Sequence, residues 1–474
     1  MNLKHFYIIL ILFSYHFFGQ SKINESEITA LKTLYNQTNG EEWLIKWDID
    51  NDPIHWYGVK VYKGNIVELK LNGNGLKGTL PSLSSLEKLK KLDISSNQLQ
   101  GNISFINNLT NLTYLDLSEN YFDGDLSNDF NANINLEELH LGNNAFTVSQ
   151  PDSFLQNQSN LTHLDISNFN LRKIPNPIRS LKKLISLNLN HNNLENNYSE
   201  IKDLKNIEAL YLANNKISNL HQSLSELPNI KILSLEGNFF DNNLLSNLSS
   251  LKNIEWLSLE NNLLTKIPNE LNQLIKLIHL NVSRNKINAG FENLRNLNAL
   301  QQLWLNNNEI EGNIPSVISQ LPNLLIVSLS SNQLSGELPS RLPSITNIVN
   351  NKFNLNQLKS YLANHKTHTE ILYSPQRYDE QKTINASLGN NVNLHQSLSK
   401  NEGYTINWFK NLDQPTNNFF ETLQINNIKE DDYTQYTAEA YYINTSGEEV
   451  FEISFFREPI TLEKSLATEE IKNK

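Results

Sequence analysis

The sequence predicts an α/β fold, in which a repeat solenoid with a curved parallel sheet and a mixed, helical-turn convex side precedes a β-sandwich. The pattern L-x-x-L-x-L-x-x-N-x-L begins twelve times between residues 66 and 324, at intervals of 23 to 25 residues, and such periods are typical of solenoids. From about residue 374 the apolar residues alternate in short runs, as in half-buried strands. A chain of 474 residues is long for one compact domain, whereas a repeat array grows along one axis.

Each repeat supplies one short strand and one asparagine. In a typical unit, Leu115 and Leu117 are two residues apart and therefore point to the same side of a strand. Stacked units are expected to bury these side chains in a shared core beneath a parallel sheet. The amide of the ninth residue, such as Asn120, can both donate and accept hydrogen bonds where the chain leaves the strand. Phe169 takes this position in the fifth repeat, which predicts a local irregularity with one of its two flanking asparagines as a substitute.

Composition argues against several classes of function. The net charge is -11 and the pI is near 5.5, which disfavours nucleic acid as a partner because phosphate binding needs a basic surface. The chain has no cysteine, so disulfides, thiolate metal sites, cysteine nucleophiles and a lipid anchor attached to cysteine are excluded.

Residues 1–20 are predicted to be a secretory signal peptide. Lys4 precedes an apolar run from Phe6 to Phe18, which ends at Gly19 and Gln20. The alternative is an uncleaved membrane anchor, but the run of 13 residues is shorter than the roughly 20 that span a bilayer. We therefore expect a secreted or cell-surface protein without a mature transmembrane segment, with a periplasmic location as the alternative.

Several repeats continue as L-x-G-x-L/I-P, at residues 76–81, 310–315 and 334–339. This pattern resembles the plant-type leucine-rich repeat, which is also found in secreted bacterial proteins. The resemblance implies short helical turns and small second strands on the convex side. Middle units such as residues 171–175 depart from the pattern, which is why a mixed convex side is expected.

The repeats need caps at both ends, because an uncapped solenoid exposes its core. Residues 21–62 have helical apolar spacing followed by three bulky tryptophans, Trp43, Trp47 and Trp56. The stretch resembles the N-terminal cap of plant-type repeat proteins, in which two cysteines bracket the motif around Trp56. Ile54 and Val61 occupy those two positions here, so an apolar pair replaces the disulfide. Residues 344–373, with a helix near 355–364, are predicted to form the C-terminal cap.

No metal or cofactor site is predicted. Asp48, Asp50 and Asp52 are spaced as in a calcium loop, but Pro53 follows where an EF-hand needs glycine. His365 and His368 are close in sequence, but two histidines without further ligands are weak evidence for a metal.

The last domain is predicted from short alternating strands at 392–394, 405–409, 423–425, 436–440 and 448–456. The segment from Asp432 to Ala438 resembles strand F of the immunoglobulin fold, in which a tyrosine, here Tyr436, lies two residues before a cysteine. The resemblance implies that Trp408 is the buried tryptophan of strand C, that Ala438 takes one cysteine position, and that Leu394 or Gln396 lies near the other. A generic β-sandwich is the alternative.

The predicted organisation therefore has six parts: a signal peptide at 1–20, an N-terminal cap at 21–62, twelve repeats at 63–343, a C-terminal cap at 344–373, an immunoglobulin-like β-sandwich at 374–460 and a charged tail at 461–474.

The outward positions of the repeat strands indicate where a partner would bind. The third, fifth and seventh residues of each repeat face outward on the concave sheet. In the early repeats these positions are polar and mostly acidic, as at Asp93 and Asp116. From the seventh repeat they become more apolar, and grouped outward apolar residues often mark interaction sites. The predicted binding residues are Tyr211, Ile232, Trp256, His279, Gln302, Trp304 and Ile326. The alternative is that neighbouring side chains or the last domain cover them.

The sequence predicts a non-catalytic protein that binds a protein or glycan partner outside the cell through this concave face. No G-x-S-x-G, H-E-x-x-H or phosphate-loop motif is present. An adhesion or envelope scaffold is one alternative, and an inhibitor of an extracellular hydrolase is another, because plant cell-wall inhibitors share this repeat type. The last domain would act as a spacer or as a second contact.

Overall fold

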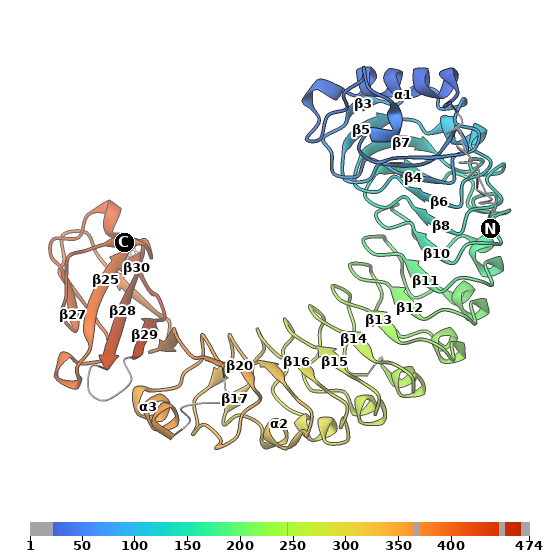
Figure 1. The fold of residues 1–474 in the computed structure, drawn as a ribbon. Helices are drawn as coiled ribbons and strands as arrows, with labels where there is room; N and C mark the ends of the chain where they lie inside the picture. Colours follow the sequence, from blue (N-terminus) through green and yellow to red (C-terminus); the bar gives the residue numbers. More distant parts are fainter. Residues whose placement is uncertain (1–21, 244, 365–369, 445–450, 466–474) are drawn as a thin grey trace, which may run out of the picture. The chain divides into compact units, whose positions relative to one another are not determined.

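A computed structural model describes residues 22–243, 245–364, 370–444 and 451–465 (Figure 1). The predicted signal peptide at 1–20 and the pair His365 and His368 lie outside these residues. The chain divides into two compact units. One contains Met1–Asn170 and Pro175–Leu184, and the other contains Leu171–Ile174 and Ile185–Lys474.

Helix α1 (Glu25–Gln37) begins the described part of the first unit and buries Leu31 and Leu34, as its helical spacing predicts. The helix also buries Glu27, which the apolar pattern did not indicate. The Glu27 carboxylate accepts a hydrogen bond from the backbone N–H of Ile66 at 2.9 Å. This bond satisfies a buried donor of the first repeat strand, which would be costly to leave unpaired.

Four buried aromatic side chains pack together, Tyr35 of α1 and three that follow the helix: Trp43, Trp47 and Trp56. The rings of Trp43 and Trp47 meet edge to face at 4.9 Å, and those of Trp47 and Trp56 stack at 4.8 Å. Two short 3-10 turns, η1 (Gly40–Glu42) and η2 (Pro53–His55), precede Trp43 and Trp56. All three tryptophans are thus buried, as expected for side chains that cover the end of a core.

The first unit contains two sets of parallel strands. β1 (Val59–Tyr62) pairs antiparallel with the first repeat strand, and the repeat strands then pair parallel in chain order. These repeat strands are β2 (Asn65–Lys70), β4 (Lys91–Asp93), β6 (Tyr114–Asp116), β8 (Glu138–His140) and β10 (His163–Asp165). Small second strands follow the first four of them: β3 (Lys77–Thr79), β5 (Gln98–Gly101), β7 (Tyr121–Asp125) and β9 (Ala145–Thr147). The helical turns of this unit are η3 (Ser104–Asn108) and η4 (Asn176–Ser180).

The second unit continues the same plan, with repeat strands side by side (Figure 1). The strands are β11 (Ser186–Asn188), β12 (Ala209–Tyr211), β13 (Ile232–Ser234), β14 (Trp256–Ser258), β15 (His279–Asn281), β16 (Gln302–Trp304), β18 (Ile326–Ser328), β20 (Ile345–Asn347) and β21 (Glu370–Leu372). The connecting turns are η5 (Ser199–Asp203), η6 (Gln222–Glu226), η7 (Ser246–Ser250), η8 (Asn269–Gln273), η9 (Phe291–Leu294) and α2 (Ser316–Gln320). Second strands occur at β17 (Glu311–Gly312) and β19 (Gln333–Leu334). The mixture of helical turns and second strands that the repeat pattern predicted is therefore present in both units.

In each unit, the asparagines of the ninth position form a buried column, as the sequence predicts. Its members are Asn74, Asn97, Asn120, Asn144, Asn192, Asn215, Asn238, Asn262, Asn285, Asn308 and Asn332. The amide of Asn262 donates to the carbonyl oxygens of Leu235, Leu259 and Glu260 at 3.0 to 3.1 Å. Its side-chain oxygen accepts from the N–H of Phe240 at 3.0 Å. Each asparagine of this kind therefore connects its own turn to the preceding repeat.

The fifth repeat departs from this column at Phe169. Its ring is buried and lies 6.0 Å from that of Phe146 and 6.3 Å from that of Phe154. Asn168 has a φ of 61°, in the left-handed region that the eighth residue also adopts in other repeats, whereas the left-handed φ of 56° at Asn170, the tenth residue, has no counterpart at the non-glycine tenth residues of the other described repeats. The predicted irregularity is present: aromatic packing takes the place of the buried amide at this position.

The column and the sheet both continue past residue 343, where the predicted repeats end. The amide of Asn351 donates to the carbonyl oxygens of Leu329 and Ile348 at 2.9 and 3.0 Å. Gln376, which is fully buried, takes the next place and donates to Ile348 and Tyr373 at 2.9 and 2.5 Å. β20 and β21 extend the parallel sheet through the predicted C-terminal cap. The helix expected there is α3 (Leu355–Asn364).

The strands after residue 374 form two groups. β25 (Thr405–Lys410), β28 (Gln435–Asn444) and β29 (Phe451–Arg457) pair antiparallel. Around them, β22 (Gln376–Tyr378) runs parallel to β29, β26 (Gln414–Pro415) pairs with β25, and β30 (Ile460–Lys464) pairs with both β23 (Lys382–Ala386) and β28. The second group is the antiparallel pair β24 (Val392–His395) and β27 (Thr422–Ile425). The 3-10 turns η10 (Lys400–Glu402) and η11 (Glu430–Asp432) lie in the connections.

The residues that suggested an immunoglobulin-like domain are buried. Trp408 on β25 is 1% exposed and donates its indole N–H to the carbonyl oxygen of Phe420 at 2.9 Å. Tyr436 donates its hydroxyl to the carbonyl oxygen of Asp432 at 3.0 Å. Ala438 lies opposite Trp408 in the β25–β28 register. The immunoglobulin-like assignment itself stays a prediction.

The expectation of a charged tail from residue 461 is wrong for its first residues. Ile460–Lys464 form β30, and Leu462 is 1% exposed. The short alternation of Ile460 and Leu462 places both side chains on one side of the strand, where they are buried. The strand pairs with β23 and β28, so partners distant in sequence decide its conformation.

Candidate functional site

The seven predicted binding residues all lie on the repeat strands β12 to β18 of the second unit. The register places five of them in one row across adjacent strands: Ile232, Trp256, His279, Gln302 and Ile326. Tyr211 and Trp304 lie in the neighbouring row, with Ser234, Ser258 and Asn281 between them. The face that carries both rows is called the strand face below.

The five residues of the first row are partly exposed, and three of them contact one another. The rings of Trp256 and His279 stack with centroids 5.1 Å apart and planes 8° apart. The His279 Nδ1 lies 3.0 Å from the side-chain oxygen of Gln302. Burial lowers the pKa of His279, because the ring has lost part of the water that would solvate its charged form. A neutral histidine therefore extends the aromatic surface of Trp256.

Trp304 is also partly exposed, but its indole nitrogen is buried and has no hydrogen-bond partner in the described part of the chain. The residue lies beside Asn281 and Ser328 in the register. Because two strand spacings separate β14 from β16, Trp256 and Trp304 are about 10 Å apart across the sheet. One extended partner can contact both.

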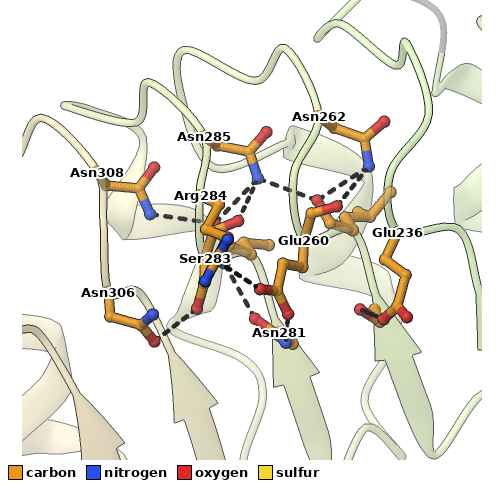
Figure 2. A network of polar contacts seen from close by, with 12 residues as sticks. Glu236, Glu260, Asn262, Asn281, Ser283, Arg284, Asn285, Asn306 and Asn308 are labelled. Carbon is orange, nitrogen blue, oxygen red and sulfur yellow. Dashed lines mark hydrogen bonds and ion pairs between the residues drawn. The ribbon is translucent and has the colours of Figure 1, made fainter. Parts of the chain in front are cut away.

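A third row, at the seventh position of the eighth to twelfth repeats, consists of polar side chains that follow the strands. Figure 2 shows this network around Glu260. Glu260 accepts a hydrogen bond from the amide of Asn281 at 2.7 Å and forms an ion pair with Arg284 at 3.2 Å. Glu236 accepts from the hydroxyl of Ser258 at 3.1 Å, and Ser283 donates to Asn306 at 2.7 Å. The strand face therefore places carboxylates beside the aromatic row.

Two exposed apolar side chains border this network. Phe239 is 52% exposed and Leu263 is 47% exposed. Phe239 is three residues after Glu236 in the sequence, and Leu263 is three residues after Glu260. Phe239 and Leu263 were not among the predicted residues because they follow the outward strand positions, and Glu236, although a seventh residue, was passed over in favour of aromatic and apolar side chains. The tenth position of the repeat was the available signal.

The strand face of the first unit has a different character. Asp93, Asp116 and His140 are aligned in one row, and Tyr114 lies in the neighbouring row. The hydroxyl of Tyr114 donates to Asp116 at 3.4 Å. Burial raises the pKa of both the Asp116 carboxyl and the Tyr114 hydroxyl. The strand face of this unit therefore carries polar and titratable side chains at these positions.

In the described ranges, no group of three or more histidine, aspartate or glutamate side chains is arranged to hold a metal ion. The same ranges contain no helix that is long and apolar enough to cross a membrane. The arrangement offers apolar contact, hydrogen bonds and carboxylates in regular rows, which is the chemistry of binding.

Comparisons with known proteins identify the repeat. Three family models match: leucine rich repeat at residues 134–194, leucine rich repeats (2 copies) at residues 87–132 and leucine rich repeat at residues 299–321. The matched segments are therefore leucine-rich repeats. No curated protein matches it in sequence.

Solved structures of leucine-rich-repeat proteins are similar to it. The PEPR1–AtPEP1 structure has 24% identity and a TM-score of 0.51, and the match covers 76% of this chain and 56% of that one. An internalin, inlF, from Listeria monocytogenes has 27% identity and a TM-score of 0.47, covering 58% and 86%. The protein LIC12759 from Leptospira interrogans has 25% identity and a TM-score of 0.47, covering 64% and 94%. The likeness to PEPR1 shows the α/β leucine-rich-repeat fold, and this chain spans just over half of that protein's length.

Proposed function

We propose that this leucine-rich-repeat protein is a non-catalytic binding protein, secreted or held at the cell surface, which recognises a protein partner through the strand face of its later repeats. The observation that carries the proposal is the row of partly exposed side chains from Ile232 to Ile326, in which Trp256 stacks on His279. Stacked, preordered aromatic side chains lose little conformational entropy when a partner covers them, and such residues dominate binding energy.

The polar network beside the row supports a specific partner. A partner that covers Trp256 would also meet the carboxylates of Glu236 and Glu260, so apolar contact and polar selection occur on the same strands. The similar structure of PEPR1 was solved with AtPEP1, and we extend to this chain the use of the fold as a binding scaffold. We do not propose that this chain binds AtPEP1.

The remaining parts of the proposal rest on sequence. The extracellular location rests on the signal peptide predicted at 1–20, and the absence of catalysis rests on the lack of a catalytic motif. We further propose that the strands after residue 374 form an immunoglobulin-like domain that acts as a spacer or second contact. The buried Trp408 and the hydrogen bond from Tyr436 to Asp432 support this assignment.

The test is capture of surface proteins from the source cells by the full-length mature chain, compared with its Trp256→Ala and Trp304→Ala double variant. An anchor residue contributes at least about 2 kcal/mol, so the loss of even one should weaken binding by about thirtyfold. The double variant should weaken binding by that factor or more. Tyr121→Ala is the matched control, because Tyr121 is 65% exposed and lies on a second strand of the first unit. Circular dichroism and thermal melting establish that each variant is folded.

Equal capture by the folded double variant and the wild type would refute the proposal and favour the scaffold function. Capture of a glycan, abolished by the double variant, would assign the same face to carbohydrate instead of protein. Stoichiometric loss of a hydrolase's activity on mixing would support the inhibitor alternative.

A further inference from the structure

The eighth and ninth repeats carry an acidic side chain with apolar residues on both sides. Glu236 and Phe239 follow strand β13, and Glu260 and Leu263 follow strand β14. The two loops are adjacent, because the N–H of Gly237 donates to the carbonyl oxygen of Glu260 at 2.9 Å. The N–H of Leu263 also donates to the carbonyl oxygen of Phe240 at 2.9 Å. The four side chains therefore belong to one continuous surface.

The two carboxylates of this surface differ in how their charge is balanced. Glu260 pairs with Arg284 at 3.2 Å and also accepts from Asn281 at 2.7 Å (Figure 2). Glu236 is half-buried and accepts a hydrogen bond from Ser258 at 3.1 Å. Within the described residues, the Glu236 carboxylate therefore has no cationic side chain at ion-pair distance.

Apolar groups lie on both sides of this charge. Ile232 and Trp256, paired in the register of β13 and β14, are partly exposed on the strand face. On the loop side, Phe239 and Leu263 are about half exposed. The serines between them, Ser234 and Ser258, are buried, so the accessible surface consists of the apolar side chains and the carboxylate.

We propose that Glu236 forms a subsite for a lysine or arginine side chain of a protein partner, whose neighbouring apolar residues contact Trp256 on one side and Phe239 and Leu263 on the other. The inference rests on the proposed function of the strand face. Lysine and arginine match this surface because an aliphatic stem packs on apolar side chains while the charged group reaches a carboxylate. A neutral glycan would satisfy the apolar surface but would leave the Glu236 charge uncompensated.

The test uses a phage-displayed library of random peptides, selected on the immobilised mature protein and then measured as synthetic peptides. Affinities are compared for the wild type, Glu236→Gln, Trp256→Ala and Glu311→Gln. Glu311 is the matched control, because it is an exposed glutamate of the same unit on β17. Glutamine keeps the size and hydrogen-bonding capacity of Glu236 and removes its charge.

We expect the selected peptides to carry a lysine or arginine between apolar residues. Their affinity should fall about tenfold or more for Glu236→Gln, because a partly desolvated charge pair is lost, and should not change for Glu311→Gln. The affinity for the wild type should also decrease with added salt, and this dependence should be weaker for Glu236→Gln.

The possible failures separate the two proposals. Peptides that depend on Trp256 but bind Glu236→Gln as tightly as the wild type would overturn the cationic subsite and leave the proposed function intact. Peptides that are acidic at the corresponding position would do the same. A selection in which no peptide depends on Trp256 or on Glu236 would overturn both proposals.

Discussion

Replacement of Asn262 by alanine removes four hydrogen bonds from the middle of the buried asparagine column. Three are donated by its amide to backbone carbonyl oxygens, and one is accepted from the N–H of Phe240 at 3.0 Å. The carbonyl oxygens keep other donors: Leu235 is also bonded by Asn238, Leu259 by Asn285, and Glu260 by the N–H of Gly237. For each of these three carbonyl oxygens, the loss of the Asn262 donor should lower the free energy of unfolding by about 0.5 kcal/mol.

The N–H of Phe240 has no other acceptor within the described chain, and the Phe240 side chain is fully buried. An unsatisfied buried donor costs about 1 to 3 kcal/mol. Together with the carbonyl contributions, the expected decrease in the free energy of unfolding of Asn262→Ala is about 2.5 to 4.5 kcal/mol.

Urea unfolding monitored by circular dichroism measures this change, and hydrogen exchange at the amide of Phe240 locates it. Asn296→Ala is the control, because Asn296 is an exposed asparagine of the same unit, and a change of about 0.5 kcal/mol or less is expected for it. A decrease below about 1 kcal/mol for Asn262→Ala, or unchanged exchange at Phe240, would show that the column does not stabilise the repeats in this way.

Two further predictions concern the row residue His279 and the residues after 374. Burial lowers the pKa of His279, so the unfolded chain binds its proton more readily. The contribution of His279 to the free energy of unfolding should therefore be largest above about pH 6.5 and should decrease as the pH falls below that value. His279→Asn should reduce that pH dependence in urea titrations, and identical pH profiles would contradict the assignment. Tyr436→Phe removes the hydrogen bond to Asp432 and should lower stability by about 1 kcal/mol, measured by denaturation; an unchanged midpoint would contradict this.

Most of the repeat architecture was predictable because its determinants are local and periodic. The two leucines of each strand and the ninth-position asparagine recur with the repeat, and the structure buries them, as at Leu257 and Asn262. Helix α3 has the predicted bounds because its apolar residues follow a helical period. The repeat pattern does not predict Gln376, whose amide donates to a backbone carbonyl oxygen as the column asparagines do although the residue is not an asparagine.

The strands near the end of the chain were harder to predict. β22, β23 and β30 are short, and each pairs with a partner far away in sequence, as Ile460–Lys464 does with Lys382–Ala386. Such pairing is difficult to predict from local alternation, because strands this short carry only one or two alternating apolar residues and their partners lie elsewhere in the chain. The predicted tail therefore began too early.

For the candidate site, the sequence by itself determined which side chains point outward, since alternation along a strand decides the face. It thus identified Trp256, His279 and Trp304. Only the tertiary structure decided how much of each remains accessible and which charges are balanced. The neighbours of a strand residue lie one repeat away along the chain, as Glu236 does for Ser258, and Arg284 for Glu260. Exposure and charge compensation depend on those pairs. The stack on His279, and the Glu236 carboxylate that no described lysine or arginine pairs with, therefore became apparent only when the repeats were placed side by side.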